Sequence, residues 1–218
     1  HLQQSCWCQS RPLFQQRNKH AVPHSFQRKL CVCASAEHCC FPTLLFRSDD
    51  QNGLRYQPSW PRYAVGQVVF ETRLKPTVVI GTQAAAVHGI SEQALCGAPS
   101  WTDVVRQLRH AIGDRPVIIF NARFDIRILK KTAAAHSDPA DWLEELTVYC
   151  VMELAAGYYG ASNRYGTISL ACAASQTGLN WEGQAHSAIA DARMTAGVVN
   201  AIAAYHLELL QEQARLKT

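Results

Sequence analysis

Two aspartates and a histidine have the residue types and positions needed for metal-assisted chemistry. Asp125 follows a short apolar run at residues 117–120 and falls in the first turn of a predicted helix, just past a predicted strand. Open α/β sheets place their chemistry at that position. Asp191 lies early in a long predicted helix, five residues after His186. Carboxylates on two helices offer the oxygen ligands that Mg²⁺ prefers, and a histidine can serve as a general base.

The same residues also have simpler interpretations. An acid in the first turn of a helix is favoured by the helix dipole, and Asp125 taken alone fits this description. Five residues on a helix correspond to a phase difference of about 140°. His186 and Asp191 therefore converge only if His186 lies in the loop before the helix. The alternative is a histidine at a helix start and a solvated aspartate.

Strands and helices alternate after residue 66, which predicts an α/β layer architecture. Residues 67–75 alternate between apolar and polar types as a strand does, and Pro76 ends them. Ser91 is a candidate N-cap. Further helices are predicted at 100–112, 122–135, 169–177 and 187–216. Residues 141–156 are predicted to be mostly helical, with a short strand at 147–151 as the alternative. Residues 157–166 are predicted to form a polar–aromatic loop.

The first 65 residues differ in composition from the rest of the chain. They hold 8 Lys/Arg against 3 Asp/Glu, whereas residues 66–218 hold 13 against 14, so charge gives no argument for nucleic-acid binding. We predict an irregular leader at 1–65, disordered or non-native, then a domain at 66–205 and a helix end or tail at 206–218. Residues 30–34 and 41–46 are apolar enough to form strands, but neither contains an acid.

Six of the nine cysteines fall in the leader. Together with nearby histidines they suggest a zinc-binding adaptor, but the C-x-C and C-C spacings suit one ion poorly. A transit peptide is a further alternative, which the Cys and Pro content fits badly. The odd cysteine count favours a reducing, cytoplasmic location, and no apolar run is long enough to span a membrane. The cluster comprises Cys6, Cys8, His20, His24, Cys31, Cys33, His38, Cys39 and Cys40.

Residues 66–202 resemble the DEDDh group of 3′–5′ exonucleases, relatives of the proofreading subunit of bacterial DNA polymerase III and of ribonuclease T. The order and spacing of the last two matching segments make this resemblance specific. It implies a ribonuclease H-like fold, in which helices flank a mixed β-sheet. The matching segments are VFETRLKP at 69–76, VHGI at 87–90, APSW at 98–101, NARFD at 121–125 and HSAIADA at 186–192.

The resemblance also implies a role for each matched residue. Asp125 and Asp191 would be catalytic acids and metal ligands, and His186 would be the general base. The family uses two Mg²⁺ or Mn²⁺ ions to remove nucleoside monophosphates from the 3′ end of a nucleic-acid strand. The choice between DNA and RNA, a polymerase partner and self-association stay open. Asn121, Phe124 and His88 would lie in segments near the substrate. For His88, a role in a turn or in packing is the alternative.

One departure from the family pattern limits these expectations. The first family motif is an Asp-x-Glu pair at the end of the first strand, and no such pair occurs before Gly66. Asp49 and Asp50 are adjacent, so in a strand they would point to opposite faces. We therefore expect impaired hydrolysis. The alternative is an inactive nucleic-acid-binding module. Because the loss coincides with the composition change and a start without Met, we hypothesise that a shifted reading frame or misjoined start supplies residues 1–65.

Overall fold

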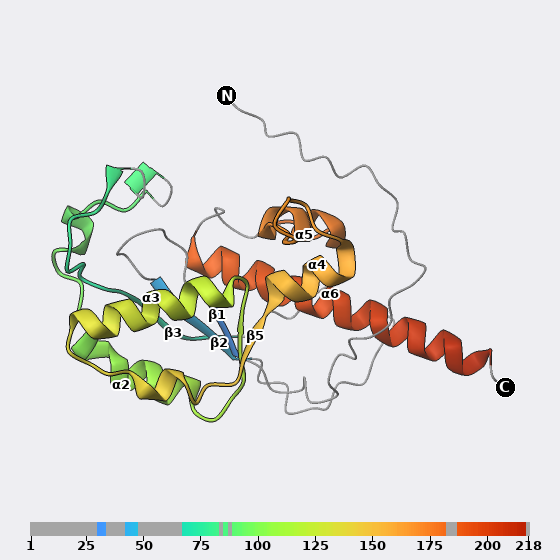
Figure 1. Ribbon diagram of the computed structural model, residues 1–218, viewed down its shortest axis with the longest axis horizontal. Coiled ribbons are helices and arrows are strands. Elements are labelled where there is room, and N and C mark those ends of the chain that lie inside the picture. The colour runs from blue at the N-terminus through green and yellow to red at the C-terminus, as the bar shows by residue number, and fades with distance from the viewer. Residues whose placement is uncertain are drawn as a thin grey trace.

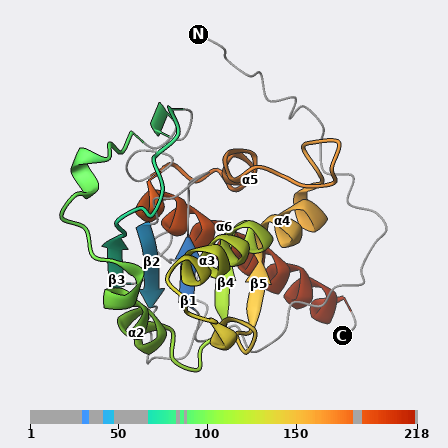
Figure 2. The same ribbon diagram turned by 60° about the vertical axis from the view of Figure 1, so that its left-hand side comes forward.

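A mixed β-sheet forms the middle layer of the protein. The structure is a computed structural model that describes residues 30–33, 42–47, 67–82, 85–86, 89–181 and 187–216. Within these residues the sheet has five strands in the order β3-β2-β1-β4-β5 (Figure 2). β1 and β4 pair in parallel, as do β4 and β5, whereas β2 runs antiparallel to both of its neighbours. The strands are β1 (Leu30–Cys33), β2 (Pro42–Arg47), β3 (Gln67–Arg73), β4 (Val117–Ile119) and β5 (Val148–Cys150).

Helices cover both faces of this sheet (Figure 1). Side chains of β4 alternate between two apolar clusters, as the pleat of a strand requires. Val117 and Ile119 pack with residues of α2 and α3, whereas Ile118 packs with residues of α4, α5 and α6. The expected mixed sheet flanked by helices is confirmed. The helices are α2 (Trp101–Ile112), α3 (Ala122–Ala135), α4 (Val151–Tyr159), α5 (Leu170–Thr177) and α6 (Ala188–Arg215), with 3-10 turns η1 (Gln93–Leu95) and η2 (Asp141–Leu143).

Local capping signals fix the ends of several helices where the sequence predicts them. At the start of α2, the Ser100 backbone N–H donates to Asp103 Oδ2 at 2.8 Å, which forms half of a capping box. The helix ends at Gly113, whose φ of 55° suits glycine. α5 begins after Ser169 and ends at Gly178, which also has a positive φ.

The alternation predicted for β3 holds for Phe70 and Leu74 but fails at Val68, which packs in the cluster on the opposite face, because the pairing with β2 shifts register between Val68 and Phe70. Phe70 and Leu74 pack in the cluster on the α2 and α3 face, and Leu74 is only 3% exposed. Val69, one position out of phase, is 40% exposed. A bulge adds one residue to a strand, so the side chains on its two sides fall out of phase with each other.

The helical interpretation of residues 141–156 holds at 141–143 and 151–156, and the strand alternative is correct at 148–150. β5 takes its conformation from parallel pairing with β4, in which Val117 lies opposite Val148. A helix follows it directly and extends to Tyr159, so the loop predicted from residue 157 begins three residues later. The Ser91 Oγ accepts a hydrogen bond from the Ala94 N–H at 3.3 Å, as a capping side chain does, although the residue directly before η1 is Glu92. The Glu92 Oε1 accepts a hydrogen bond from the Ile80 N–H at 2.8 Å.

Two strands of the sheet come from the first 65 residues. β1 and β2 match the predicted apolar segments closely, and neither sequence contains an acid. Apart from Cys31 and Cys33 in β1, the members of the Cys/His cluster lie outside the described residues.

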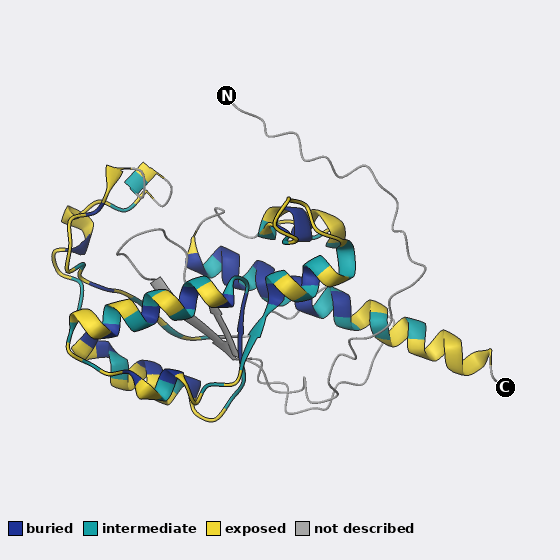
Figure 3. Cartoon of the chain, viewed as in Figure 1, coloured by how far each residue is buried: buried dark blue, intermediate teal, exposed yellow. Residues whose placement is uncertain are grey.

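α6 is long enough to extend past the rest of the fold. It packs on β1 and β2 with its first half, and its C-terminal half is largely exposed (Figure 3). Tyr205, Leu207 and Leu210 are each more than 40% exposed there. Within the described part of the chain, no helix combines the length and the apolar character needed to cross a membrane.

Candidate active site

Asp125 lies in the first turn of α3, immediately after β4. The strand ends at Ile119, and the Phe120 carbonyl accepts hydrogen bonds from the Met152 backbone N–H at 2.8 Å and from Cys150 Sγ at 3.4 Å. These bonds tie the turn after β4 to the start of α4. The Asn121 carbonyl then accepts from the Asp125 N–H at 3.1 Å, which begins the helix. Asp125 is 3% exposed.

Asp191 occupies the equivalent position in α6. Ser187 is the N-cap, and its Oγ accepts a hydrogen bond from the Ala190 N–H at 3.2 Å. The Ser187 carbonyl accepts a hydrogen bond from the Asp191 N–H at 2.9 Å. The Thr195 hydroxyl, itself buried, donates to the Asp191 carbonyl at 2.7 Å and so braces the same turn. Thr195 is not among the residues predicted for the site, although its spacing of four residues from Asp191 is the signal for such a side-chain bond to the backbone.

Apolar packing holds the first turn of α6 beside β4. Ile118 and Phe120, which lead into the Asp125 turn, belong to one cluster with Ala188 and Ala192, which flank Asp191. The two acids are therefore carried on segments that share one part of the core. Asp191 is 7% exposed.

Burial separates these two acids from other acids at the same kind of position. Asp103, Asp141 and Glu153 also lie in first helical turns, and all three are exposed. Hydrogen bonds from the Ser100 side chain and backbone lower the pKa of Asp103, as expected for a capping acid. Helix-dipole stabilisation operates at the surface and does not require burial. The dipole alone therefore does not account for Asp125 and Asp191.

Of the other predicted site residues, two lie outside the described residues: His186 and His88. Asn121 and Phe124 are half-buried beside Asp125. The Arg127 guanidinium carbon lies over the Phe124 ring, 5.3 Å from its centroid. No three His, Cys, Asp or Glu side chains come together as a metal-binding group within the described part of the chain. The donors present are two buried carboxylates, which suit a hard divalent ion better than a soft one.

β1 occupies the position in the sheet where the first family motif is expected. It is the parallel neighbour of β4, with Leu30 opposite Val117 and Cys31 opposite Ile118. Parallel strands end at the same edge of a sheet, so β1 ends on the side where β4 leads to Asp125. Its sequence, LCVC, supplies no carboxylate.

Comparisons with known proteins identify an exonuclease family and agree with the fold. A family model described as Exonuclease matches residues 62–199. The chain is 34% identical over 147 residues to an uncharacterized exonuclease, CP81, of Escherichia phage 186, covering 64% of this chain and 75% of the phage protein.

The fold is shared with solved structures of other proteins, among them two nucleases. One is exonuclease X in complex with 5′ overhanging duplex DNA, with a TM-score of 0.51, 20% identity, and coverage of 78% of this chain and 88% of that chain. The other is the nuclease domain of 3′hExo, described as a DEDDh family member and bound to rAMP. Its TM-score is 0.58 at 11% identity, over 88% of this chain and 95% of that chain.

Proposed function

Because the chain belongs to the DEDDh, DnaQ-like exonuclease family, we propose that it acts on the 3′ end of nucleic-acid strands through Asp125, His186 and Asp191. Exonucleases of this kind generally use divalent metal ions. Asp125 and Asp191 are the proposed ligands, and Mg²⁺ or Mn²⁺ the proposed ions. The burial of these two acids, in contrast to the exposed first-turn acids of other helices, is the observation that carries the proposal.

Each residue has a separate task in this proposal. Asp125 and Asp191 present carboxylate oxygens at the ends of helices that the core holds rigidly, so little reorganisation is needed when an ion binds. His186 accepts the proton of the attacking water. Phe124 and Asn121, beside Asp125, contact the terminal nucleotide. A divalent ion bound there would lower the pKa of that water. It would also stabilise the negative charge that develops on the phosphate.

We further propose that hydrolysis is weak because the first acidic pair is missing. Two carboxylates are few ligands for two ions, and β1 contributes none from its sequence. A chain of this kind would bind nucleic acid and shorten it slowly. A binding module without any cleavage is the second candidate, and the absence of acids from β1 is the observation that favours it.

The first experiment follows shortening of a 5′-labelled single strand with Mg²⁺ or Mn²⁺. We expect Asp125→Asn and Asp191→Asn to reduce the rate about 100-fold or more, since changes outside the ligand shell of metal sites already cost about 10–100-fold. Asp141→Asn is the matched control, because Asp141 is an exposed first-turn acid. Equal rates in all four proteins would contradict the roles assigned to the two acids.

The second experiment restores the missing pair. Positions 31 and 33 have the spacing of Asp-x-Glu and lie in the parallel neighbour of β4. We expect the combined change Cys31→Asp and Cys33→Glu to raise the metal-dependent rate. Thr43→Asp with Leu45→Glu in β2 adds the same charges with the same spacing and is the control. If the restored protein binds the strand, keeps its circular dichroism spectrum and still cleaves nothing, the binding module is the better assignment.

A further inference from the structure

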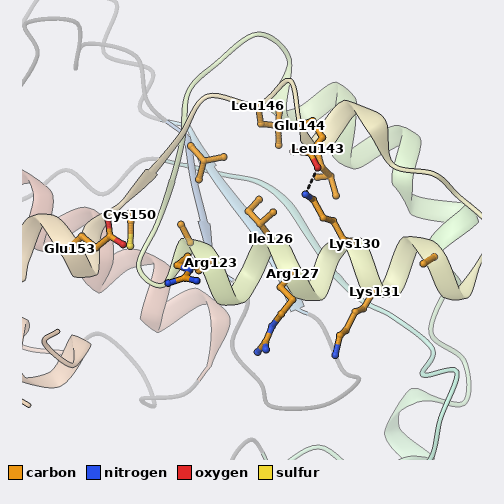
Figure 4. Close-up of a pocket in the computed structure, with 13 residues that line it drawn as sticks. Arg123, Ile126, Arg127, Lys130, Lys131, Leu143, Glu144, Leu146, Cys150 and Glu153 are labelled. Atoms are coloured by element: carbon orange, nitrogen blue, oxygen red, sulfur yellow. Dashed lines mark hydrogen bonds and ion pairs between the residues drawn. The ribbon is translucent and has the colours of Figure 1, made fainter. Parts of the chain in front are cut away.

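α3 carries a dense group of cations beside the candidate active site. Four of the thirteen Lys and Arg residues after residue 65 fall between positions 123 and 131. All four line a groove of about 820 Å³ between α3 and the segment that runs through η2, β5 and the start of α4 (Figure 4). At one end the groove is lined by Ala122 and Arg123, in the first turn of α3, which also carries the buried Asp125.

Three of these cations form a row along one side of the helix. Arg123, Arg127 and Lys131 are spaced by four residues, a separation that keeps them on one side and advances about 6 Å per step. All three are exposed. In Figure 4 the side chains of Arg127 and Lys131 extend in the same direction from α3. We call these three residues the α3 cationic row.

The fourth cation has a different partner. Lys130 Nζ forms an ion pair with Glu144 Oε1 across the groove, which neutralises one of the two carboxylates in its lining. The other, Glu153, lies near the Arg123 end. The groove therefore keeps an excess of positive charge, although the chain after residue 65 has slightly more acids than bases.

An ordinary solvated helix face does not account for the row. Exposed helices gain stability from opposite charges four residues apart, whereas like charges at that spacing destabilise them. The α3 cationic row contains two such like-charged pairs, and a bound polyanion would remove their cost. Arg127 is also held over the Phe124 ring, which orients a guanidinium next to the Asp125 turn and leaves its N–H groups for an anion.

We propose that the α3 cationic row binds successive phosphates of the strand whose 3′ end reaches Asp125. The regular spacing and the start of the row at the Asp125 turn favour a nucleic-acid backbone over an acidic peptide. The strand then runs along α3 away from the site, and the contacts carry no base sequence preference. This inference rests on the proposed function and adds the path of the substrate outside the reacting end.

Binding without metal tests the path separately from catalysis. The probe is a 5′-fluorescein oligothymidylate of about 20 nucleotides, longer than the roughly 4–16 nucleotides covered by single-strand-binding modules. Its affinity is measured by anisotropy in EDTA at several salt concentrations. Arg127→Ala with Lys131→Ala should reduce the slope of log affinity against log salt by about 1.4, since each cation on a single strand contributes about 0.7. Alanine favours helix, so α3 should stay folded.

Arg73→Ala with Lys75→Ala is the matched control. It removes the same charge from exposed residues of and beside β3, at the opposite edge of the sheet from β5. We expect its slope to match the wild type. Equal slopes for the two double variants, or no change in either, would overturn the proposal. So would poly-glutamate competing as well as unlabelled oligothymidylate in the wild-type protein, because the row would then bind any polyanion.

The two proposals fail in different ways. If no variant shortens the strand but the slopes differ as expected, the exonuclease proposal fails and the path remains. If shortening depends on Asp125 but the slopes do not differ, the path alone is wrong.

Discussion

The N-cap of α6 gives a sharp test of how the fold supports the site. Ser187 and Ser169 are both N-cap serines whose Oγ accepts a hydrogen bond from the backbone N–H three residues later, at 3.2 and 3.1 Å. Replacing an N-cap serine by alanine costs about 1 kcal/mol. We therefore expect Ser187→Ala and Ser169→Ala to lose the same free energy of unfolding, each lowering the melting temperature by about 2–4 °C for a protein of this size.

Only Ser187→Ala should affect the site. The first turn of α6 holds Asp191, and its N–H donates to the Ser187 carbonyl, so fraying of this turn moves the carboxylate. Ser169 begins α5, where no proposed ligand lies. The assays are urea unfolding for stability and titration with Mn²⁺ followed by electron paramagnetic resonance for ion affinity. We expect weaker Mn²⁺ binding in Ser187→Ala and unchanged binding in Ser169→Ala.

Glycine provides an internal check, because an N-cap glycine costs only a few tenths of a kcal/mol relative to serine. Ser187→Gly should recover most of the stability and of the Mn²⁺ affinity. The reasoning is refuted if both alanine variants weaken Mn²⁺ binding equally. It is also refuted if Ser187→Gly loses as much stability as Ser187→Ala, since the hydroxyl would then have a role other than capping.

Two further predictions concern stability. The Trp101 indole N–H donates to Asp138 Oδ2 at 2.8 Å, whereas the buried Trp142 indole N–H has no hydrogen-bond partner among the described residues. Trp101→Phe should lower the free energy of unfolding by about 2–3 kcal/mol, because hydrogen bonds to charged groups contribute roughly 1.5–3 kcal/mol. Trp142→Phe should lower it clearly less. Urea unfolding measures both, and equal losses would contradict this. Burial, followed by the charges of Tyr159, Tyr205 and Glu208, raises the pKa of Tyr158 above its usual value of 10.0. The neutral phenol therefore adds stability that is fully present below pH 10.0 and is lost as the pH rises further. Tyr158→Phe should make the free energy of unfolding fall less steeply above that pH, and an unchanged slope would contradict this.

The parts of the fold that the sequence predicts are those specified locally. The ends of α2, α5 and α6 are set by serine N-caps or glycine C-caps. In β3 the alternation is visible from Phe70 to Leu74, beyond the register shift. β5 has three residues, and its conformation depends on pairing with β4, far away in the sequence. The local pattern therefore leaves helix and strand open at 147–151, and tertiary pairing decides for the strand at 148–150.

The candidate site divides in the same way. The positions of Asp125 and Asp191 could be predicted, because each follows a recognisable helix start. Their burial could not, because Asp141 and Glu153 have the same local position and are exposed. Tertiary packing distinguishes the acids: Ala122 and Leu129 of α3 belong to one apolar cluster, and Ala188 and Ala192, which flank Asp191, belong to the other.

Fold and chemistry make different demands on β1. A central strand needs β-compatible, largely apolar residues, and the LCVC sequence meets that need as parallel neighbour of β4. A divalent ion needs oxygen ligands, which that sequence does not supply. The sheet can therefore retain its strand order while an ion loses ligands, since pairing uses backbone groups that every residue other than proline provides. For this reason, restoring two carboxylates to β1 tests the site more directly than any further comparison of folds.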